Sequence, residues 1–212
     1  MKTEFDLMVN GKLYNSFNSD LEELRVKARD LVLKYNNSSP YEVELRKILL
    51  KEIFSNEKNV DTAFFEPSIR VEYGFNMRFG KNFYMNFDCV LMDVCPITIG
   101  DNVMFGPRVV VATPMHPLLA DERIAQQYPD GFYNIEYAKP ITIGNNVWVA
   151  TNVTICGGVH IGDNSVIAAG SVVTKDIPSN VIAGGVPCKV IRELNETDRM
   201  NVWETYIKEK QK

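Results

Sequence analysis

The sequence contains two histidines, His116 and His160, and these are the candidates for any reaction that needs an imidazole. A hydroxyl group is a weak nucleophile at neutral pH, and histidine is the side chain best suited to take its proton there. His116 lies in VATPMHPL, where a regular apolar pattern stops. This position favours a general base at the mouth of a loop, and a surface histidine in a turn before Pro117 is the alternative. His160 holds a regular position inside the pattern, which favours a structural role.

The apolar pattern around these histidines has a period of six residues. From Ile141 it runs ITIGNN, VWVATN, VTICGG, VHIGDN, SVIAAG and SVVTKD, with an aliphatic third residue and a small fourth residue in each block. The same register occurs in ITIGDN, VMFGPR and VVVATP from Ile97, and a looser version spans residues 79–91. The looser set is offset by two residues, which predicts a small insertion at residues 93–96.

A period of six predicts short strands that turn a corner every six residues, so that three strands form one coil of a triangular prism. The aliphatic residues point into the prism, and the small residues let the chain bend. Neighbouring coils hydrogen-bond at the strand spacing of ~4.8 Å, and several coils must stack because one cannot bury its own core. A β-sandwich is the alternative, but its strands alternate with a period of two. The expected class is mainly β, a parallel β-helix.

The repeat stops at Thr113 and restarts in phase at Pro140, so residues 113–139 form an inserted loop. A long loop that interrupts a regular repeat is usually functional or disordered. Its apolar and aromatic residues predict an ordered loop that packs against something. These residues are Leu118, Leu119, Ile124, Tyr128, Phe132, Tyr133 and Tyr137.

Helices are predicted before the repeats. The first spans Asp20 to Asn36, where apolar residues recur at helical spacing, and Ser19 with Glu22 forms a capping box at its start. The second begins near residues 39–42. Its apolar stripe consists of Val43, Leu45, Ile48, Leu49 and Ile53. Together these helices predict an N-terminal cap over residues 1–60.

The β-helix is expected over residues 61–192, followed by a C-terminal segment, residues 193–212. In that segment Met200, Trp203 and Ile207 have near-helical spacing, which predicts a short helix that closes the structure.

The composition, 45% apolar and 24% charged, is that of an ordinary globular protein. No apolar run approaches the ~20 residues of a membrane-spanning helix. The first twelve residues lack the apolar core of a secretory signal, so we expect a cytoplasmic protein. The four cysteines form no CxxC pair and are expected to be buried in a reducing compartment. A net charge of −4 argues against broad nucleic-acid binding, although a local basic patch can hold an anionic ligand.

Several segments together resemble the maltose and galactoside O-acetyltransferases, and the similarity covers almost the whole chain. They are YGFNMRFGKNFYMNFDCVLMDVCPITIGDN, VATPMHP, KPITIGNNVW, AAGSVVTKDIPSNVIAGGVPCKVIREL, GKLY and YNNSSP. The resemblance implies a left-handed β-helix and a homotrimer with active sites between adjacent subunits. It also implies transfer of an acetyl group from acetyl-CoA to a hydroxyl of a sugar such as maltose, glucose or a galactoside. A three-sided prism has flat faces that can pack around a threefold axis.

On the acceptor side, the resemblance makes His116 the catalytic base. Asn86 and Asp93 match residues that face the acceptor sugar, and a solvated turn is the alternative for Asp93. Two positions depart from the galactoside enzymes, because Glu72 and Ser16 stand where those enzymes have a small hydroxyl residue and a carboxylate. Glu136 ends a loop longer than in typical members and is expected to orient either the sugar or His116.

On the donor side, Trp148 and Thr151 match a wall and a backbone amide near the thioester. The positions that match the coenzyme groove are Ala169, Thr174, Lys175, Lys189 and Arg192. Flexible cationic side chains suit phosphates, and small residues let the pantetheine arm lie along the coils. Lys189 stands where an arginine is often found, and a solvated corner charge is the alternative for Lys175.

This arrangement implies direct attack of the hydroxyl on the thioester, without an acyl-enzyme and without a metal. A backbone N–H near Thr151 would hold the developing oxyanion. Three alternatives remain. The first is an acetyltransferase for another hydroxylated compound, of the xenobiotic type. The second is a γ-type carbonic anhydrase, whose zinc needs three histidines where this chain offers His116 as its one plausible ligand. The third is a non-catalytic scaffold.

Overall fold

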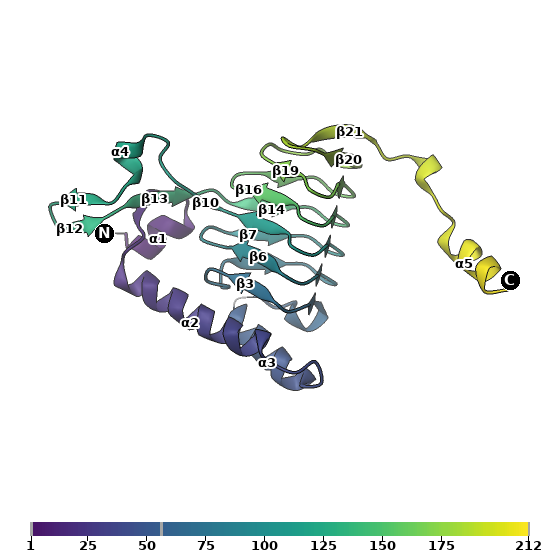
Figure 1. Cartoon of the computed structure of the whole chain (residues 1–212), viewed down its shortest axis with the longest axis horizontal. Helices are drawn as coiled ribbons and strands as arrows, with labels where there is room; N and C mark the ends of the chain where they lie inside the picture. Colours follow the sequence, from purple (N-terminus) through teal and green to yellow (C-terminus); the bar gives the residue numbers. More distant parts are fainter. Residues whose placement is uncertain (1, 56, 212) are drawn as a thin grey trace.

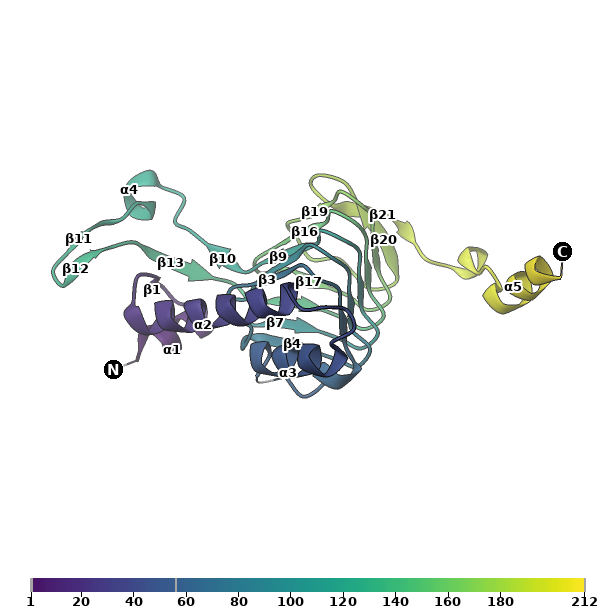
Figure 2. The same cartoon turned by 60° about the horizontal axis from the view of Figure 1, so that its bottom comes forward.

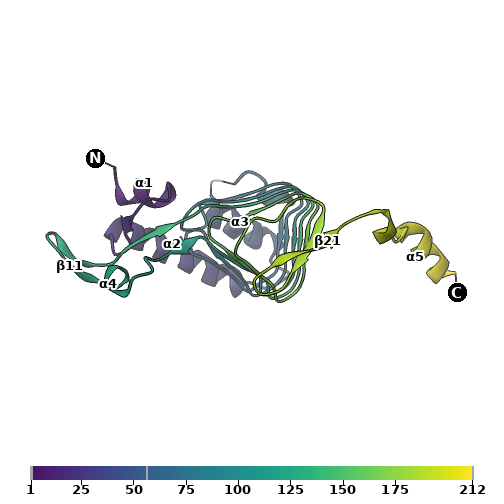
Figure 3. The same cartoon turned by 90° about the horizontal axis from the view of Figure 1, so that it is seen from above.

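The computed structural model describes residues 2–55 and 57–211, whose central body is a parallel β-helix flanked by helices (Figure 1). Seen from above, successive coils superimpose (Figure 3). Three sheets, counted over the described residues, form the sides of the coil. The first sheet contains β2 (Phe64–Phe65), β5 (Tyr84–Met85), β8 (Met104–Phe105), β15 (Trp148–Val149), β18 (Val166–Ile167), β20 (Val181–Gly184) and β21 (Lys189–Glu193). The second contains β3 (Ile69–Val71), β6 (Cys89–Met92), β9 (Val110–Ala112), β16 (Thr154–Cys156) and β19 (Val172–Val173). The third contains β4 (Met77–Phe79), β7 (Ile97–Ile99), β14 (Ile141–Ile143) and β17 (His160–Ile161).

The third residues of the hexapeptides are buried in the core of the prism, as the sequence predicted. They are Phe79, Met85, Leu91, Ile99, Phe105, Val111, Ile143, Val149, Ile155, Ile161, Ile167 and Val173. First residues of the hexapeptides, such as Ile97, Val103, Ile141 and Val147, are buried beside them. Phe79 pairs with Ile99, 20 residues along the chain, whereas Ile143 pairs with Ile161, 18 residues along. The longer coil contains the predicted insertion at residues 93–96, which lies between β6 and β7.

We call the turns after the first, second and third sheets the first, second and third corners. At the third corner, asparagines stack along the prism, each donating a side-chain N–H to the amide oxygen of the next at 2.9–3.0 Å. Each has φ between 56° and 60°, a left-handed conformation that asparagine adopts more readily than most residues. This asparagine ladder consists of Asn82, Asn102, Asn146, Asn164 and Asn180.

The helices α2 (Ser19–Asn36) and α3 (Val43–Ile53) close one end of the prism, whereas α1 (Glu4–Val9) lies to its side, beside the arm (Figure 1). Phe54, which follows α3, is fully buried and packs on Phe65 and Phe79 of the first coils. Tyr35 of α2 donates its hydroxyl to the carbonyl of Phe65 at 2.6 Å. Aromatic rings and one buried hydrogen bond therefore cover the core at this end.

Details of the helices differ from the predictions. Asn18, not Ser19, caps α2, because its side-chain oxygen accepts from the amides of residues 20 and 21. In α3 the stripe was predicted only in part, since Leu49, Leu50 and Ile53 are buried while Val43, Leu45 and Ile48 are exposed. The sequence did not predict α1, whose start has a capping box of Thr3 and Asp6.

The inserted loop is an ordered arm that projects from the coil beside α1 (Figures 1 and 2). Its elements are β10 (Pro114–Met115), α4 (Ala120–Arg123), β11 (Gln126–Tyr128), β12 (Gly131–Tyr133) and β13 (Ile135–Ala138). β13 pairs on one side with β10 and on the other with β1 (Tyr14–Asn15). Leu118, Leu119, Ile124 and Phe132 are exposed in the single chain because the arm extends away from the prism, so the packing expected for them is not made within this chain.

The C-terminal helix α5 (Val202–Lys210) lies on the opposite side of the coil from the arm and stands clear of it (Figures 1 and 3). Trp203 is 70% exposed, and none of the described residues of α5 is buried. The helix was predicted, but its closing role was wrong, since β20 and β21 end the coil before the chain leaves it.

Two other expectations concern the cysteines and membrane-spanning helices. The cysteines are unpaired, and Cys89, Cys95 and Cys188 are buried as predicted, while Cys156 is half-buried. Burial raises the pKa of the Cys89 and Cys95 thiols to about 11. In the described part of the chain, no helix combines the length and apolar character needed to cross a bilayer.

We predict that the asparagine ladder stabilises the fold through both its hydrogen bonds and its backbone conformation. Asn146→Gly removes two ladder bonds but tolerates positive φ, and should lower the free energy of unfolding by about 1 kcal/mol. Asn146→Ala removes the same bonds and adds left-handed strain, so its loss should be larger by about 1 kcal/mol. Denaturant unfolding of both variants measures the difference. Equal losses would show that the conformation at this corner has no energetic role.

Candidate functional site

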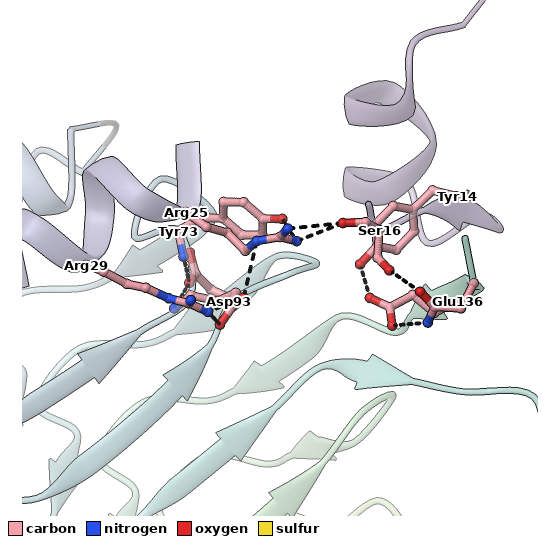
Figure 4. Close-up of polar contacts among 9 residues, drawn as sticks. Tyr14, Ser16, Arg25, Arg29, Tyr73, Asp93 and Glu136 are labelled. Atoms are coloured by element: carbon pink, nitrogen blue, oxygen red, sulfur yellow. Dashed lines mark hydrogen bonds and ion pairs between the residues drawn. The ribbon is translucent and has the colours of Figure 1, made fainter. Parts of the chain in front are cut away.

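Polar residues gather where β1 pairs with β13, because this antiparallel pairing places Tyr14 opposite Glu136. Side chains directly opposite each other on two such strands lie on one face. The Tyr14 hydroxyl donates to Oε1 of Glu136 at 2.5 Å (Figure 4). In the next row on the same face, the Ser16 hydroxyl donates to the side-chain oxygen of Asn134 at 2.8 Å.

His116 follows β10, the strand on the other side of β13 from β1. Its Nδ1 lies 3.3 Å from Oε2 of Glu136, the second oxygen of the same carboxylate. The side chain of Glu136 is 13% exposed, whereas that of His116 is 49% exposed. A carboxylate beside Nδ1 favours a proton on that nitrogen and leaves Nε2 free to accept one. The pair therefore has the arrangement of a general base with its orienting carboxylate.

Arg25 of α2 extends this polar group toward the coil. Its Nη1 and Nη2 both donate to the Ser16 carbonyl at 3.1 Å, and Nη1 reaches the Tyr73 hydroxyl at 3.4 Å. Nε lies 3.9 Å from Glu72, which also pairs with Arg29 at 3.2 Å. An unbroken set of polar contacts thus runs from α2 to His116.

Glu72 lines a cavity of about 540 Å³ between α2 and the second sheet. Residues that share this cavity include Arg29, Arg70, Val90 and Met92. With arginines beside it, Glu72 stands at a polar edge of an otherwise largely apolar cavity. Its position is compatible with the acceptor side proposed from the sequence.

Asp93 and Ser16 are not placed to face a ligand, and for these two residues the structure corrects the expectation. Asp93 is 0% exposed, and its oxygens accept from the backbone amides of Glu72, Tyr73 and Asn76 at 2.8–3.2 Å. Burial raises the pKa of the Asp93 carboxyl, an effect opposed by those amide donors. Asp93 is thus neither a solvated turn residue nor an acceptor contact. It is a buried carboxyl group that holds the backbone of residues 72–76 at the second corner. Ser16 is buried too, and its hydroxyl is taken up by Asn134.

The donor-side candidates Trp148, Thr151 and Ala169 lie together on a shallow apolar cavity of about 550 Å³. We call this cavity the first-corner groove, and it is lined by Gly106, Pro107, Trp148, Ala150, Thr151, Val166, Ala168 and Ala169. The coils approach closely here, since a Cβ on Gly106 would lie 2.8 Å from the Thr151 amide nitrogen. Small residues therefore keep the groove open along the coils.

The remaining coenzyme candidates are spread over other places. Thr174 and Lys175 follow β19 and lie exposed at the second corner. Lys189 and Arg192 lie on β21, where the Arg192 guanidinium binds both oxygens of Asp198 at 2.5 and 2.8 Å. That guanidinium lowers the pKa of Asp198 to about 2. A phosphate would have to compete with Asp198 for this arginine.

Asn86 is separated from the other acceptor candidates. It follows β5 of the first sheet and therefore lies at the first corner. Its side-chain oxygen accepts from the Phe87 amide at 2.8 Å. His116 instead continues from β9 of the second sheet, at the second corner. A single chain therefore carries His116 and the first-corner groove at different corners of its prism.

Sequence reasoning missed Tyr14, Asn134 and Arg25, which hold Glu136 and its neighbours in place. Tyr14 and Ser16 alternate, as residues on one face of a strand do, but a two-residue strand is too short for this signal to stand out. Arg25 sits on a helix whose apolar face alone was considered. Across residues 2–55 and 57–211 there is no group of three or more His, Cys, Asp or Glu side chains able to hold a metal ion.

Family models match three parts of the chain. Residues 7–56 match the maltose acetyltransferase hexapeptide capping motif, residues 140–175 match the bacterial transferase hexapeptide, and residues 96–114 match the hexapeptide repeat of succinyl-transferase. Galactoside O-acetyltransferase from Escherichia coli is 44% identical over 196 residues, which cover 92% of each chain. A putative acetyltransferase from Saccharomyces cerevisiae is 40% identical and covers 90% of this chain and 93% of its own.

Solved structures agree with these sequence matches. A maltose O-acetyltransferase from Clostridium difficile superimposes with a TM-score of 0.83 at 42% identity, covering 92% of this chain and 99% of its own. A galactoside acetyltransferase in complex with coenzyme A gives a TM-score of 0.80 at 42% identity, with 93% and 94% covered. The chain therefore belongs to the hexapeptide-repeat acetyltransferase family that includes the galactoside and maltose O-acetyltransferases.

Proposed function

We propose that this protein transfers an acetyl group from acetyl-CoA to a hydroxyl of a sugar such as maltose, glucose or a galactoside, with His116 as general base. The observation that carries the proposal is the 3.3 Å contact of His116 with Glu136 on a half-exposed ring. The relatives support the donor, since a galactoside acetyltransferase and a Vibrio cholerae acetyltransferase were solved with coenzyme A and acetyl-CoA respectively. The acceptor class is supported by the names of the similar galactoside and maltose O-acetyltransferases.

In the proposed reaction the sugar hydroxyl attacks the thioester carbonyl directly while Nε2 of His116 takes its proton. Glu136 stabilises the imidazolium that forms, because its carboxylate lies beside Nδ1. The carbonyl oxygen becomes an oxyanion, for which a backbone N–H near Thr151 is the proposed donor. Collapse of the tetrahedral intermediate breaks the C–S bond, and the leaving thiolate takes up the proton from the imidazolium. No acyl-enzyme and no metal are needed for this sequence of steps.

The first-corner groove is the proposed site for the pantetheine arm of the coenzyme. Trp148 supplies an apolar wall, and Ala169 leaves room for a narrow chain along the coils. Thr174, Lys175 and Lys189 are the proposed polar and cationic partners of the coenzyme, and Arg192 joins them if Asp198 releases it. On the acceptor side we propose Glu72 at the edge of its cavity, and we propose Asn86 from its position at the neighbouring corner.

We also propose a homotrimer with each site formed between two subunits. Val90, Met92, Val110, Ala112 and Val172 point outward from the second sheet and are only partly exposed, which gives that side an apolar surface. Within one chain, the first-corner groove and His116 lie at different corners and cannot meet. A second copy packed on the second sheet could bring its own first-corner groove toward His116. Unpaired, mostly buried cysteines fit a reducing compartment, and we place the reaction in the cytoplasm.

Replacing the base tests the mechanism. His116→Ala should lower turnover by roughly 10²- to 10⁴-fold while acetyl-CoA binding is retained, because only proton transfer is lost. Release of free thiol from acetyl-CoA with maltose, glucose, galactosides and chloramphenicol measures this effect and ranks the acceptors. His160→Ala, a change on the exposed side of the third sheet, is the control and should keep full turnover. Transfer to chloramphenicol alone would favour the xenobiotic alternative, and full activity of His116→Ala would exclude His116 as the base.

Mixing subunits tests the shared site. His116→Ala removes the base, and Ala169→Trp fills the groove, so each variant alone should be inactive. In randomly mixed trimers a site is complete when both of its halves come from intact surfaces, so co-expression should restore about one quarter of wild-type activity. Purifying a differently tagged pair in two affinity steps removes the homotrimers and should raise the recovered activity to about one third, because each mixed trimer contains one complete site. No recovered activity in that assembly would place the whole site within one chain.

A further inference from the structure

We propose that Tyr14 is a positioning residue that acts on His116 through Glu136, fixing the carboxylate that orients the imidazole. The inference rests on the proposed function, because orientation of this ring matters only if His116 accepts the proton. Tyr14 would then connect the N-terminal segment to the chemistry without touching substrate.

The first step of this inference is the division of the Glu136 carboxylate between different partners. Oε1 accepts from the Tyr14 hydroxyl at 2.5 Å, and Oε2 lies 3.3 Å from Nδ1 of His116. The Asn134 amide also donates to Oε2, at the longer distance of 3.4 Å. With each oxygen held from a different direction, the plane of the carboxylate is fixed. Removing the partner of Oε1 leaves the group free to rotate about its terminal bond.

The second step is the rigidity of Tyr14 itself. Its side chain is 2% exposed and packs with Met8, Leu21 and Tyr73 in a small apolar cluster. The backbone is held as well, because Tyr14 pairs with Glu136 across the strands and the Asn15 amide donates to Glu4 at 2.6 Å. The phenol therefore presents its hydroxyl from a fixed place.

The third step concerns charge. Burial, together with the hydrogen bond and negative charge of Glu136, raises the pKa of Tyr14, so the phenol remains protonated and remains a donor. The other ionisable groups that face it are Arg25 from α2, which favours the phenolate slightly, and Tyr73, which opposes it. Glu136 consequently has a neutral donor on Oε1, the oxygen that does not face His116.

The test compares two buried tyrosines that each lose one hydroxyl. Tyr14→Phe keeps the packed ring and removes the donor to Glu136, and should lower kcat about tenfold with the KM for acetyl-CoA unchanged. Tyr35→Phe is the matched control, because its hydroxyl also makes one buried bond, to the Phe65 carbonyl, but it lies under the prism away from His116. Tyr35→Phe should lower the free energy of unfolding by a similar amount and leave kcat unchanged. Thiol release with maltose and with a methyl galactoside gives both constants.

A spectroscopic readout separates positioning from folding. With two histidines in the chain, the ¹⁵N spectrum of the imidazoles is simple, and His160→Asn assigns the remaining signals to His116. At a pH where the ring is neutral, the wild-type protein should carry its proton mainly on Nδ1. Tyr14→Phe should shift this population toward the other tautomer, Glu136→Gln should shift it further, and Tyr35→Phe should leave it unchanged.

A wild-type tautomer population in Tyr14→Phe would overturn the inference, and so would an unchanged kcat. Failure of the proposed function looks different. If the wild-type protein acetylates none of the sugars, the enzymatic proposal fails, while the spectrum still decides whether Tyr14 controls the ring through Glu136.

Discussion

Hydrogen bonding between each coil and the coil below it is the constraint on which the rest of the structure depends. Strands of the three sheets pair in parallel with the strand one turn away, except that β21 pairs antiparallel with β20. Most of the coil backbone therefore needs no partner distant in sequence. The asparagine ladder repeats this registry with side chains, and its left-handed backbone conformation recurs at the third corner of successive coils. Because the coils cannot slip, residues far apart along the chain stay at fixed heights on the prism. Both the first-corner groove and the base of the arm depend on this registry.

The period of six could be predicted because it is imposed by the coil itself. An inward-pointing residue such as Val149 or Ile167 must be apolar in every block, whatever lies outside the prism. The extra residues near Asp93 showed up as a break in phase for the same reason. Elements outside the coil obey no such repeat. The exposed faces of α3 and the position of α5 depend on what the helices meet, and amphipathic spacing alone predicted contacts that the chain does not make.

The residues of the candidate site also differ in how far the sequence alone predicts them. His116 and Glu136 could be found because a rare imidazole and a carboxylate stand at the two ends of an interruption in the repeat. Asp93 looked equally available in the sequence, yet three backbone amides enclose it, and that outcome depends on the path of the chain around one corner. The role of Tyr14 could not be predicted from the sequence. Its partner lies 122 residues away, and the pairing of β1 with β13 brings them together only in the folded chain.

The arm leaves the prism and returns through the paired strands β10 and β13, and the next coil resumes without a change of phase. The length and composition of the arm are thus independent of the coils above and below it. Substitutions, insertions or deletions among residues 117–134 can accumulate without disturbing the groove that we assign to the donor. The segment beside His116 can therefore change in length and sequence between related proteins while the coils on either side keep their spacing.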